Sequence, residues 1–324
     1  MMDFVDTAGS EYRTVIEGCG LLDRSERGKL ALTGGEAKGF LQGQVTNDVE
    51  ALREGQGCYA AFLTQKGKML GDVRVLDAGD ELLLDTERVA LQQLFNMIRR
   101  YSLGYDVQLR KRTLERGLIS LIGPTSDEVV GGVPAPEHAH VPIELDGVRA
   151  RAIRTDVGID LLLESDRLDA LRAALERHGA VAVSDPAAEC LRVERGTPRY
   201  GVDLDDSVIP QEAGLNARAV SFTKGCYVGQ ETVARLYYRG KPNRHLRGLL
   251  LSGSASAGDR LRLEDRSLGT LTSVVESPRL GWIGLALVRR EAAPGATIAV
   301  GDEGVRAEVV ELPFEPALYD RHTG

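Results

Sequence analysis

The sequence has no apolar stretch that approaches the roughly 18–20 residues needed to span a bilayer. Its first segment, Met1–Arg13, carries acidic side chains and lacks the apolar core of a secretory signal. Hydrophobic residues make up 43% of the chain and charged residues 27%, which is ordinary for a soluble globular protein. We therefore expect a cytoplasmic protein without a membrane partner.

Patterns typical of metal sites are also lacking. The four cysteines form no Cys-x-x-Cys pair, and their spacing fits no zinc module. Two of the five histidines, His138 and His140, lie in a proline-rich stretch that resembles a linker. We predict free thiols in a reducing compartment and no dedicated metal site.

The net charge of −8 argues against general nucleic-acid binding, so we expect no stable complex with nucleic acid. One segment, 224–247, departs from this balance, because it holds six cations, one acid and three interleaved tyrosines. It is interpreted either as an anion-binding wall for a polyanionic ligand or RNA, or as a solvated face. The cations are Lys224, Arg235, Arg239, Lys241, Arg244 and Arg247, and the tyrosines are Tyr227, Tyr237 and Tyr238.

The most informative segment, 224–231, reads Lys-Gly-Cys-Tyr-Val-Gly-Gln-Glu. Its two glycines suggest a tight, exposed loop. The charge of Lys224 favours the thiolate form of Cys226, which is the nucleophilic form of cysteine. A free cysteine can also be a small buried apolar residue, and this alternative stays open. The pattern makes Cys226 and Lys224 candidates for a reactive pair.

Hydrophobic periodicity divides the 324 residues into three units. Strands and helices alternate irregularly through the first two units, which predicts mixed α+β domains. From about residue 246 onward, short strands follow one another closely, which predicts an all-β barrel. The expected domains are 1–112 (completed by 186–240), 113–185 and 241–324.

Several segments together resemble the YgfZ-type folate-binding proteins, which are related to the aminomethyltransferase (T-protein) of the glycine cleavage system. The resemblance covers nearly the whole chain and implies a three-domain ring with folate held in a central channel. The segments that carry it are 40–49, 66–69, 192–196, 200–201, 209–215, 224–231, 269–273 and 313–314.

The resemblance also implies which residues act. Glu194 corresponds to a pterin-binding glutamate, and an ionised carboxylate can accept both hydrogens of a pterin edge that carries two donors. Cys226, Lys224 and Asp72 are the candidate catalytic residues, and the implied cofactor is tetrahydrofolate or a one-carbon derivative of it. The expected folate contacts are Glu194, Tyr200, Asn47, Gln230 and Arg235.

One position departs from the transferase pattern. The T-protein carries paired aspartates where this chain has Gly71-Asp72. Without the first carboxylate, protonation of a departing amine loses its most evident agent, which weakens the expectation of transferase chemistry. Asp72 could serve in its place, or could cap a turn.

Three functions follow from these observations. The first is a folate-binding accessory protein that supports iron–sulfur cluster assembly or repair and cluster-dependent tRNA modification, with iron–sulfur enzymes or assembly proteins as partners. The alternative is a tetrahydrofolate-dependent aminomethyltransferase. The third is an RNA-binding module that uses the cations and tyrosines of 224–247.

Overall fold

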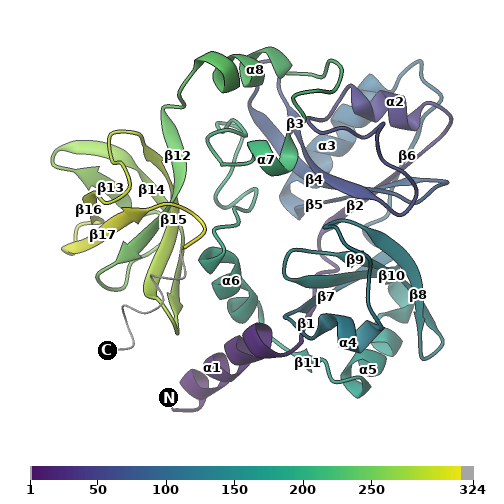
Figure 1. Ribbon diagram of the computed structural model, residues 1–324, viewed down its shortest axis with the longest axis horizontal. Helices are drawn as coiled ribbons and strands as arrows, with labels where there is room; N and C mark the ends of the chain where they lie inside the picture. The colour runs from purple at the N-terminus through teal and green to yellow at the C-terminus, as the bar shows by residue number, and fades with distance from the viewer. Residues whose placement is uncertain (1, 315–324) are drawn as a thin grey trace.

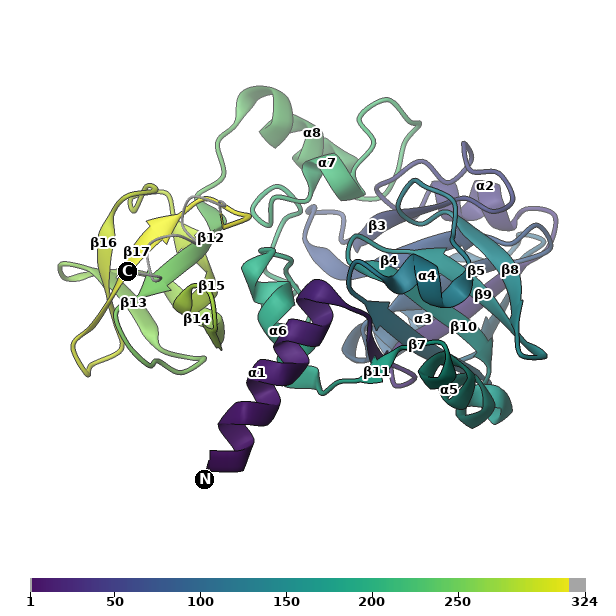
Figure 2. The same ribbon diagram turned by 60° about the horizontal axis from the view of Figure 1, so that its bottom comes forward.

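Figure 1 shows the computed structural model of the chain, in which three bodies form a ring-like arrangement. The structure describes residues 2–314. Two sheet-rich domains lie side by side, and a closed barrel lies across from them; helices α1 (Met2–Glu17) and α6 (Asp185–Glu194) run between (Figures 1 and 2). The expected α+β fold with two mixed domains and a C-terminal barrel is confirmed.

The first domain is built on a five-stranded antiparallel sheet in the order β3-β4-β5-β2-β6. Helix α3 (Arg88–Tyr101) covers one face, because Ala90, Leu91, Leu94 and Ile98 recur at helical spacing and form a buried stripe. The short helix α2 (Ala37–Gln42) follows β2. The strands are β2 (Gly28–Thr33), β3 (Gly57–Leu63), β4 (Met69–Asp77), β5 (Leu82–Thr86) and β6 (Gln108–Lys111).

A later stretch of the chain completes the core of this domain. Helix α7 (Asn216–Ala219) lies against β3, and helix α8 (Gln230–Arg239) follows the glycine-rich loop. The buried residues that this stretch adds to the first core include Tyr200, Leu204, Val208, Leu215, Val220, Tyr227 and Val233.

The second domain has a six-stranded sheet in the order β11-β1-β7-β10-β9-β8. Strand β1 pairs with β7 and β11, so it belongs to this sheet, whereas the expected division assigned residues 1–112 to the first domain. Its helices are α4 (Ser126–Val130) and α5 (Leu168–Arg177), the latter after a 3-10 turn (Ser165–Arg167). The strands are β1 (Gly20–Asp23), β7 (Arg116–Ile122), β8 (His140–Leu145), β9 (Val148–Arg154), β10 (Gly158–Glu164) and β11 (Val181–Ala182).

The two sheets share an apolar interface, which fixes one domain against the other. Burial of such a cluster removes apolar surface from water and stabilises the contact by roughly 25 cal/mol per Å². The cluster consists of Ala31, Leu76, Ala78 and Leu83 from the first domain and Leu118, Ile153 and Leu162 from the second.

The barrel closes in the order β12-β15-β14-β13-β16-β17, and closure leaves no unpaired sheet edge. Side chains that alternate along the strands fill its interior, including Leu249, Leu271, Ala286 and Val309. The strands are β12 (Arg244–Leu251), β13 (Arg260–Leu263), β14 (Arg266–Ser277), β15 (Gly281–Arg289), β16 (Thr297–Val300) and β17 (Val305–Val310).

Helix α6 connects the barrel to the rest of the molecule. Its Arg192 donates to Asp203 Oδ2 at 2.7 Å and to Ser273 Oγ of β14 at 2.6 Å. Ser273 in turn donates to Asp203 Oδ1 at 2.7 Å. Asp203 is buried, so this charge network lies in a region of low dielectric, where removal of one partner is costly.

None of the helices in residues 2–314 is both long and apolar enough to cross a membrane.

The substitution Asp203→Asn is expected to lower the free energy of unfolding by about 2 kcal/mol, because it removes one of the two carboxylates that pair with the largely buried guanidinium of Arg192, the other being Glu189. Asp302→Asn is the matched control, since Asp302 is 90% exposed in its pair with Arg262, and its effect should stay within about 0.5 kcal/mol. Urea titration followed by the fluorescence of Trp282, the one tryptophan of the chain, measures both. Equal midpoints for the two variants would contradict the role given to Asp203.

Candidate functional site

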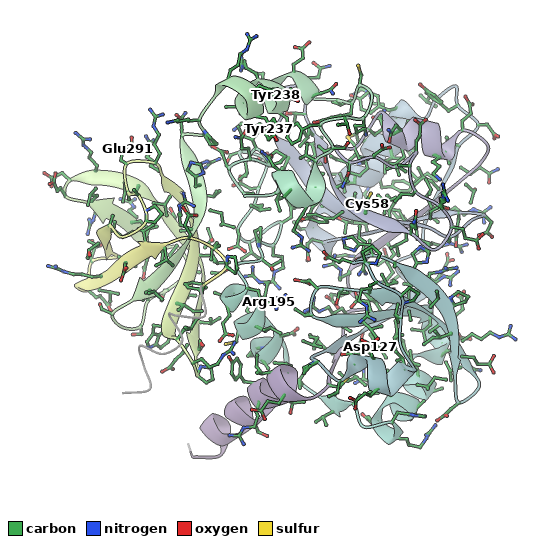
Figure 3. All side chains as sticks on the ribbon, viewed as in Figure 1. Cys58, Asp127, Arg195, Tyr237, Tyr238 and Glu291 are labelled. Carbon is green, nitrogen blue, oxygen red and sulfur yellow. The ribbon has the colours of Figure 1, made fainter. Side chains whose placement is uncertain are left out.

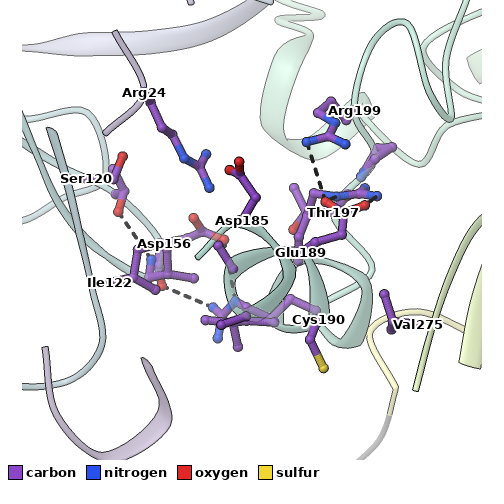
Figure 4. Close-up of a pocket in the computed structure, with 18 of the residues that line it drawn as sticks. Arg24, Ser120, Ile122, Asp156, Asp185, Glu189, Cys190, Thr197, Arg199 and Val275 are labelled. Carbon is purple, nitrogen blue, oxygen red and sulfur yellow. Dashed lines mark hydrogen bonds and ion pairs between the residues drawn. The ribbon is translucent and has the colours of Figure 1, made fainter. Parts of the chain in front are cut away.

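A cavity of about 1750 Å³ lies where the three domains and helices α1 and α6 meet. Ligand pockets commonly measure roughly 300–1,000 Å³, so this space can hold a ligand larger than a single ring system. Its walls include Tyr12 of α1, Asp72 of the first sheet, Asp160 of the second sheet, Glu189 of α6 and Trp282 of the barrel. Figure 4 shows part of it around α6.

Asp72 lies on β4 and its side chain is only 7% exposed. The hydroxyl of Tyr59 donates to Asp72 Oδ2 at 2.6 Å. Burial raises the pKa of Asp72 to about 6, although the Tyr59 hydrogen bond and the nearby Arg27 act in the opposite direction. Burial and the adjacent carboxylate likewise raise the pKa of Tyr59. The pair therefore places a carboxyl that can gain or lose a proton near neutral pH inside the cavity.

Gly71 lies on the opposite face of β4, because neighbouring residues of a strand point to opposite sides of the sheet. A Cβ at position 71 would lie 2.9 Å from Cβ of Ala90 and 3.0 Å from a methyl of Leu94, both on α3. A carboxylate at this position would point into the helix rather than into the cavity. The glycine at position 71 therefore removes no acid from the cavity wall, so it does not weaken the expectation of transferase chemistry in the way that the sequence suggested.

Buried ion pairs join the two sheets along the cavity wall. Arg74 Nη1 donates to Asp160 Oδ2 at 2.6 Å, and Arg74 Nη2 lies 3.0 Å from Asp85 Oδ2. Arg27 Nε donates to Asp85 Oδ1 at 2.9 Å. Burial alone would raise the pKa of Asp85, but Arg27 and Arg74 outweigh it and lower the pKa. The wall thus holds fixed charges of both signs.

Helix α6 presents Glu189 and Arg192 to the cavity. Arg199 Nη1 lies 3.5 Å from Glu189 Oε2, as Figure 4 shows. Arg195 Nε, also on the cavity wall, lies 3.6 Å from Asp156 Oδ2 of the second domain. These pairs place carboxylates and guanidinium groups along one side of the space.

Glu194, the expected pterin ligand, is 1% exposed and is not among the described residues that line the cavity. Its carboxylate accepts hydrogen bonds from Tyr12 Oη at 2.7 Å, from Arg279 Nη2 at 2.8 Å and from Ser277. It shares a helix face with Cys190, whose Sγ lies 3.8 Å from Glu194 Oε1. The structure thus places Glu194 where it holds α1, α6 and the barrel together.

Lys224 is buried, and its ammonium group donates to three backbone oxygens: those of Gln42 at 2.6 Å, Val45 at 2.7 Å and Asn47 at 2.7 Å. An ammonium has three N–H donors, so none remains for a hydrogen bond to the thiolate of Cys226. Burial lowers the pKa of Lys224 to about 8. The prediction that Lys224 and Cys226 form a reactive pair is therefore not supported by the contacts of Lys224: its ammonium anchors the loop to the turn after α2, while Cys226 is exposed.

The other expected folate contacts do not converge on the cavity. Tyr200 is buried in the first core. Asn47 Nδ2 donates to the backbone oxygens of Tyr59 at 2.8 Å and Arg218 at 3.3 Å. Gln230 begins α8 and Arg235 is exposed on it. Among the described lining residues, Asp72 is the one candidate that the sequence identified.

Segment 224–247 does not form the continuous cationic wall that the sequence suggested. Arg244 pairs with Glu212 and Arg247 with Glu311, while Lys224 is buried. Arg235, Arg239 and Lys241 are exposed on and after α8. Beside them Phe222 stacks on Tyr237 at a centroid distance of 3.8 Å, and Tyr238 meets Tyr237 edge-on at 5.0 Å. Figure 3 shows Tyr237 and Tyr238 on α8, away from Arg195 on the cavity wall.

Sequence reasoning missed Tyr59, Arg74, His138 and Asp160, which all line the cavity. One signal was present, because β4 carries two charged residues, Asp72 and Arg74, among apolar residues in its interior, besides Asp77 at its end. Among the described residues, no group of three or more histidine, cysteine, aspartate or glutamate side chains could hold a metal ion.

Comparison with protein families gives two matches that together span most of the chain. The GCVT N-terminal domain matches residues 2–224, and the glycine cleavage T-protein C-terminal barrel domain matches residues 244–315.

The chain is also similar to curated proteins over most of its length. A chloroplastic protein of Arabidopsis thaliana is 28% identical over 309 residues, which cover 91% of this chain and 71% of the relative. An aminomethyltransferase of Rubrobacter xylanophilus is 30% identical over 318 residues, covering 94% and 85%. One from Halothermothrix orenii is 29% identical over 325 residues, covering 94% and 90%.

A solved structure supports the fold. The glycine cleavage aminomethyltransferase T of Bartonella henselae superposes with a TM-score of 0.84 at 23% identity, covering 95% of this chain and 89% of that one. The family matches cover both the mixed domains and the barrel, in the order in which the structure builds them. The chain belongs to the glycine cleavage T-protein family.

Proposed function

We propose that the protein binds a reduced folate in its central cavity and transfers the one-carbon unit of a carrier-bound aminomethyl group to that folate as a methylene, with release of ammonia. Relatives in Rubrobacter xylanophilus and Halothermothrix orenii are named aminomethyltransferases. The observation that carries the proposal is Asp72, a buried carboxyl with a pKa near 6 on the wall of a large cavity. An acid–base group poised near the working pH is what proton transfer in such a reaction requires.

The lining residues fit a folate in size and in chemistry. Leu191, Val275 and Trp282 offer apolar surface for a flat ring system. Asp72 and Asp160 offer oxygen atoms that can accept hydrogen bonds from ring N–H groups. Cationic side chains on the same walls suit a carboxylate tail.

In this proposal the chain contributes proton transfer and orientation. Tetrahydrofolate supplies the nitrogen atoms that receive the one-carbon unit. As the carbon forms bonds to two folate nitrogens, its bonds to the carrier sulfur and to the amine would break, and the two folate N–H protons would leave with the carrier thiol and with ammonia. In this step Asp72 would donate a proton to the departing amine and regain one from a folate nitrogen. The hydroxyl of Tyr59, which donates to Asp72 Oδ2, fixes the carboxyl and stabilises the charge left on it after the proton has gone.

A second candidate function is an accessory role for iron–sulfur enzymes, as the resemblance to YgfZ-type proteins implies. One observation favours it: Cys226 is exposed on the Lys224–Glu231 loop and is not among the described residues that line the cavity. An exposed thiol can exchange groups with a partner protein, whereas a single thiolate cannot hold a cluster that needs about four ligands. This role would use folate binding together with a surface thiol.

Replacing Asp72 with asparagine keeps the side-chain shape and an acceptor for Tyr59 but removes the transferable proton. We expect kcat for the formation of methylene-tetrahydrofolate, with an aminomethylated lipoyl carrier as donor, to fall by roughly 10²- to 10⁴-fold. Glu276→Gln is the matched control, because Glu276 is an exposed carboxyl on the same cavity, and it should keep its activity. Undiminished turnover by Asp72→Asn would remove Asp72 from the mechanism, and an inactive wild type would overturn the transferase proposal.

Asp72→Asn is expected to lower kcat but to raise the free energy of unfolding at neutral pH. The pKa of Asp72 is raised from 3.8 to about 6 on folding, so between these values the native state binds more protons than the unfolded state. Wild-type stability on this account falls as the pH rises from about 4 to about 6, by roughly 3 kcal/mol. Urea titrations at pH 4 and pH 7 should show Asp72→Asn gaining by about that amount relative to wild type. A difference that stays constant with pH would contradict the raised pKa.

The accessory role makes a separate prediction. Cys226→Ser is expected to keep folate binding and aminomethyl transfer, because the thiol lies outside the cavity lining, yet to lose the ability to restore iron–sulfur enzyme activity in a strain that lacks the wild-type gene. Restoration to the wild-type level would exclude a role for this thiol. Asp72→Asn is the informative comparison, since it should lose aminomethyl transfer but still restore the activity of the iron–sulfur enzymes.

A further inference from the structure

His138 lies on the wall of the cavity in the loop that precedes β8. This loop belongs to the second domain but packs against the first: the backbone N–H of His140 donates to Gly55 O at 2.8 Å. The carbonyl oxygen of His138 lies so close to Gly57 that a Cβ there would be only 2.9 Å away. The approach of the two domains therefore holds the position of His138.

The backbone of His138 has a φ of 70°, in the left-handed region that residues with a Cβ rarely adopt. Neighbouring hydrogen bonds maintain this conformation: His138 N–H donates to Arg154 O at 2.9 Å, and Arg154 N–H donates to Ala139 O at 2.8 Å. Residues held in such conformations cluster at ligand-binding sites, where the surroundings fix a side chain in a required direction.

The imidazole has an unused nitrogen. Its Nδ1 is buried and has no hydrogen-bond partner among residues 2–314, although the side chain as a whole is 13% exposed. Glu137 Oε1 lies 3.6 Å from the other nitrogen, Nε2, and Glu137 is itself paired with Arg218 at 2.6 Å. The carboxylate favours the tautomer with the proton on Nε2, which leaves Nδ1 as an acceptor.

The charges around His138 keep it neutral. Burial, followed by the effects of Arg74 and Arg218, lowers the pKa of His138 to about 3; Asp160 and Asp85 act in the opposite direction. A neutral imidazole between guanidinium groups can accept a hydrogen bond near pH 7 without competition from its own protonation. An uncompensated buried acceptor is costly, and such atoms in native proteins call for an explanation.

Arg74, on the same wall, has the complementary unused group. It is 8% exposed, its Nη1 donates to Asp160, and its Nη2 lies beside Asp85. Its Nε–H has no acceptor among the described residues. A buried N–H donor and a buried nitrogen acceptor therefore both belong to cavity-lining side chains whose charges influence each other.

We infer that His138 and Arg74 form a recognition site for an amide edge of the bound ligand, with His138 Nδ1 accepting from its N–H and Arg74 Nε–H donating to its carbonyl oxygen. An amide that carries both groups on one edge satisfies the two orphan atoms together. The inference rests on the proposed function, in which the ligand is a reduced folate. The lactam of its pterin ring, where N–H adjoins C=O, is such an edge.

The alternative is that His138 only shapes the loop. His138→Gly separates the two roles, because glycine adopts the left-handed conformation without strain and removes the imidazole. We expect the dissociation constant for tetrahydrofolate to rise about 5- to 30-fold, the loss for one good hydrogen bond to a buried acceptor. The midpoint of thermal unfolding should not fall. His178→Gly, at the exposed histidine that directly follows α5, is the control and should leave the affinity unchanged.

Imidazole ¹⁵N NMR gives a readout that a structural role would not move. With tetrahydrofolate, the Nδ1 resonance of His138 should shift as an acceptor gains a hydrogen bond, while that of His178 stays in place. The 4-amino analogue of the ligand, which carries a donor in place of the carbonyl oxygen, should bind wild type at least about 5-fold more weakly. The ratio between the dissociation constants of the 4-amino analogue and of tetrahydrofolate should be smaller in His138→Gly than in the wild type.

The outcomes distinguish the two proposals. If wild type binds tetrahydrofolate, His138→Gly binds it equally well and the His138 resonance does not move, the recognition site is overturned while the proposed function stands. If wild type does not bind tetrahydrofolate at all, the proposed function fails and the recognition site fails with it. A lower thermal midpoint with unchanged affinity would assign His138 to the loop alone.

Discussion

The buried pair of Arg192 and Asp203 is the interaction on which the arrangement of the three bodies depends. It joins α6 to strand β14 of the barrel, since Thr272 and Ser273 of that strand also donate to Asp203. Helix α1 contacts both ends of α6: Glu11 accepts from the backbone N–H of Ser184, just before α6, at 3.0 Å, and Tyr12 donates to Glu194, the last residue of α6, at 2.7 Å. Apolar packing supports the same wall: Val193 of α6 packs with barrel residues such as Ile283, and Ala187, Ala188 and Leu191 pack with α1 and the second sheet.

Burial in this arrangement gives Asp72 its chemistry. The same carboxyl on an exposed strand would remain ionised at neutral pH, whereas here the loss of solvent raises its pKa and the opposing effect of Tyr59 and Arg27 keeps it within reach of neutrality. The neighbouring Asp85 shows the contrast, because two guanidinium groups hold it ionised. The neighbouring strands β4 and β5 thus carry a titratable carboxyl, Asp72, and a carboxylate that stays ionised, Asp85.

Much of the architecture could be predicted from the sequence, because it follows from local periodicity. The mixed strands and helices of the first two units and the short strands after about residue 246 are predicted by this periodicity, and the structure confirms them. The place of β1 in the second sheet could not be predicted, since strand pairing across about a hundred residues leaves no local pattern. The cavity could not be predicted for the same reason, because its walls come from segments that are distant in the chain.

The site residues divide on the same principle. Asp72 could be identified because it stands at one of the two positions where the resemblance implies paired aspartates. Glu194 and Lys224 were assigned to the ligand and to Cys226, yet each is enclosed by protein donors or acceptors that only the fold brings near. His138 could not be recognised, since its backbone conformation depends on contacts with another domain.

The sequence positions of the cavity walls have a consequence for how the protein is made. The residues that line the cavity include Tyr12, near the start of the chain, and Trp282, near its end. The cavity is therefore complete only after most of the chain has left the ribosome. Domains generally fold in order of synthesis, N-terminal first. The first core therefore has to await the residues between 200 and 233 that complete it, and the leading helix has to await a docking partner translated about 170 residues later, at Asp185–Glu194.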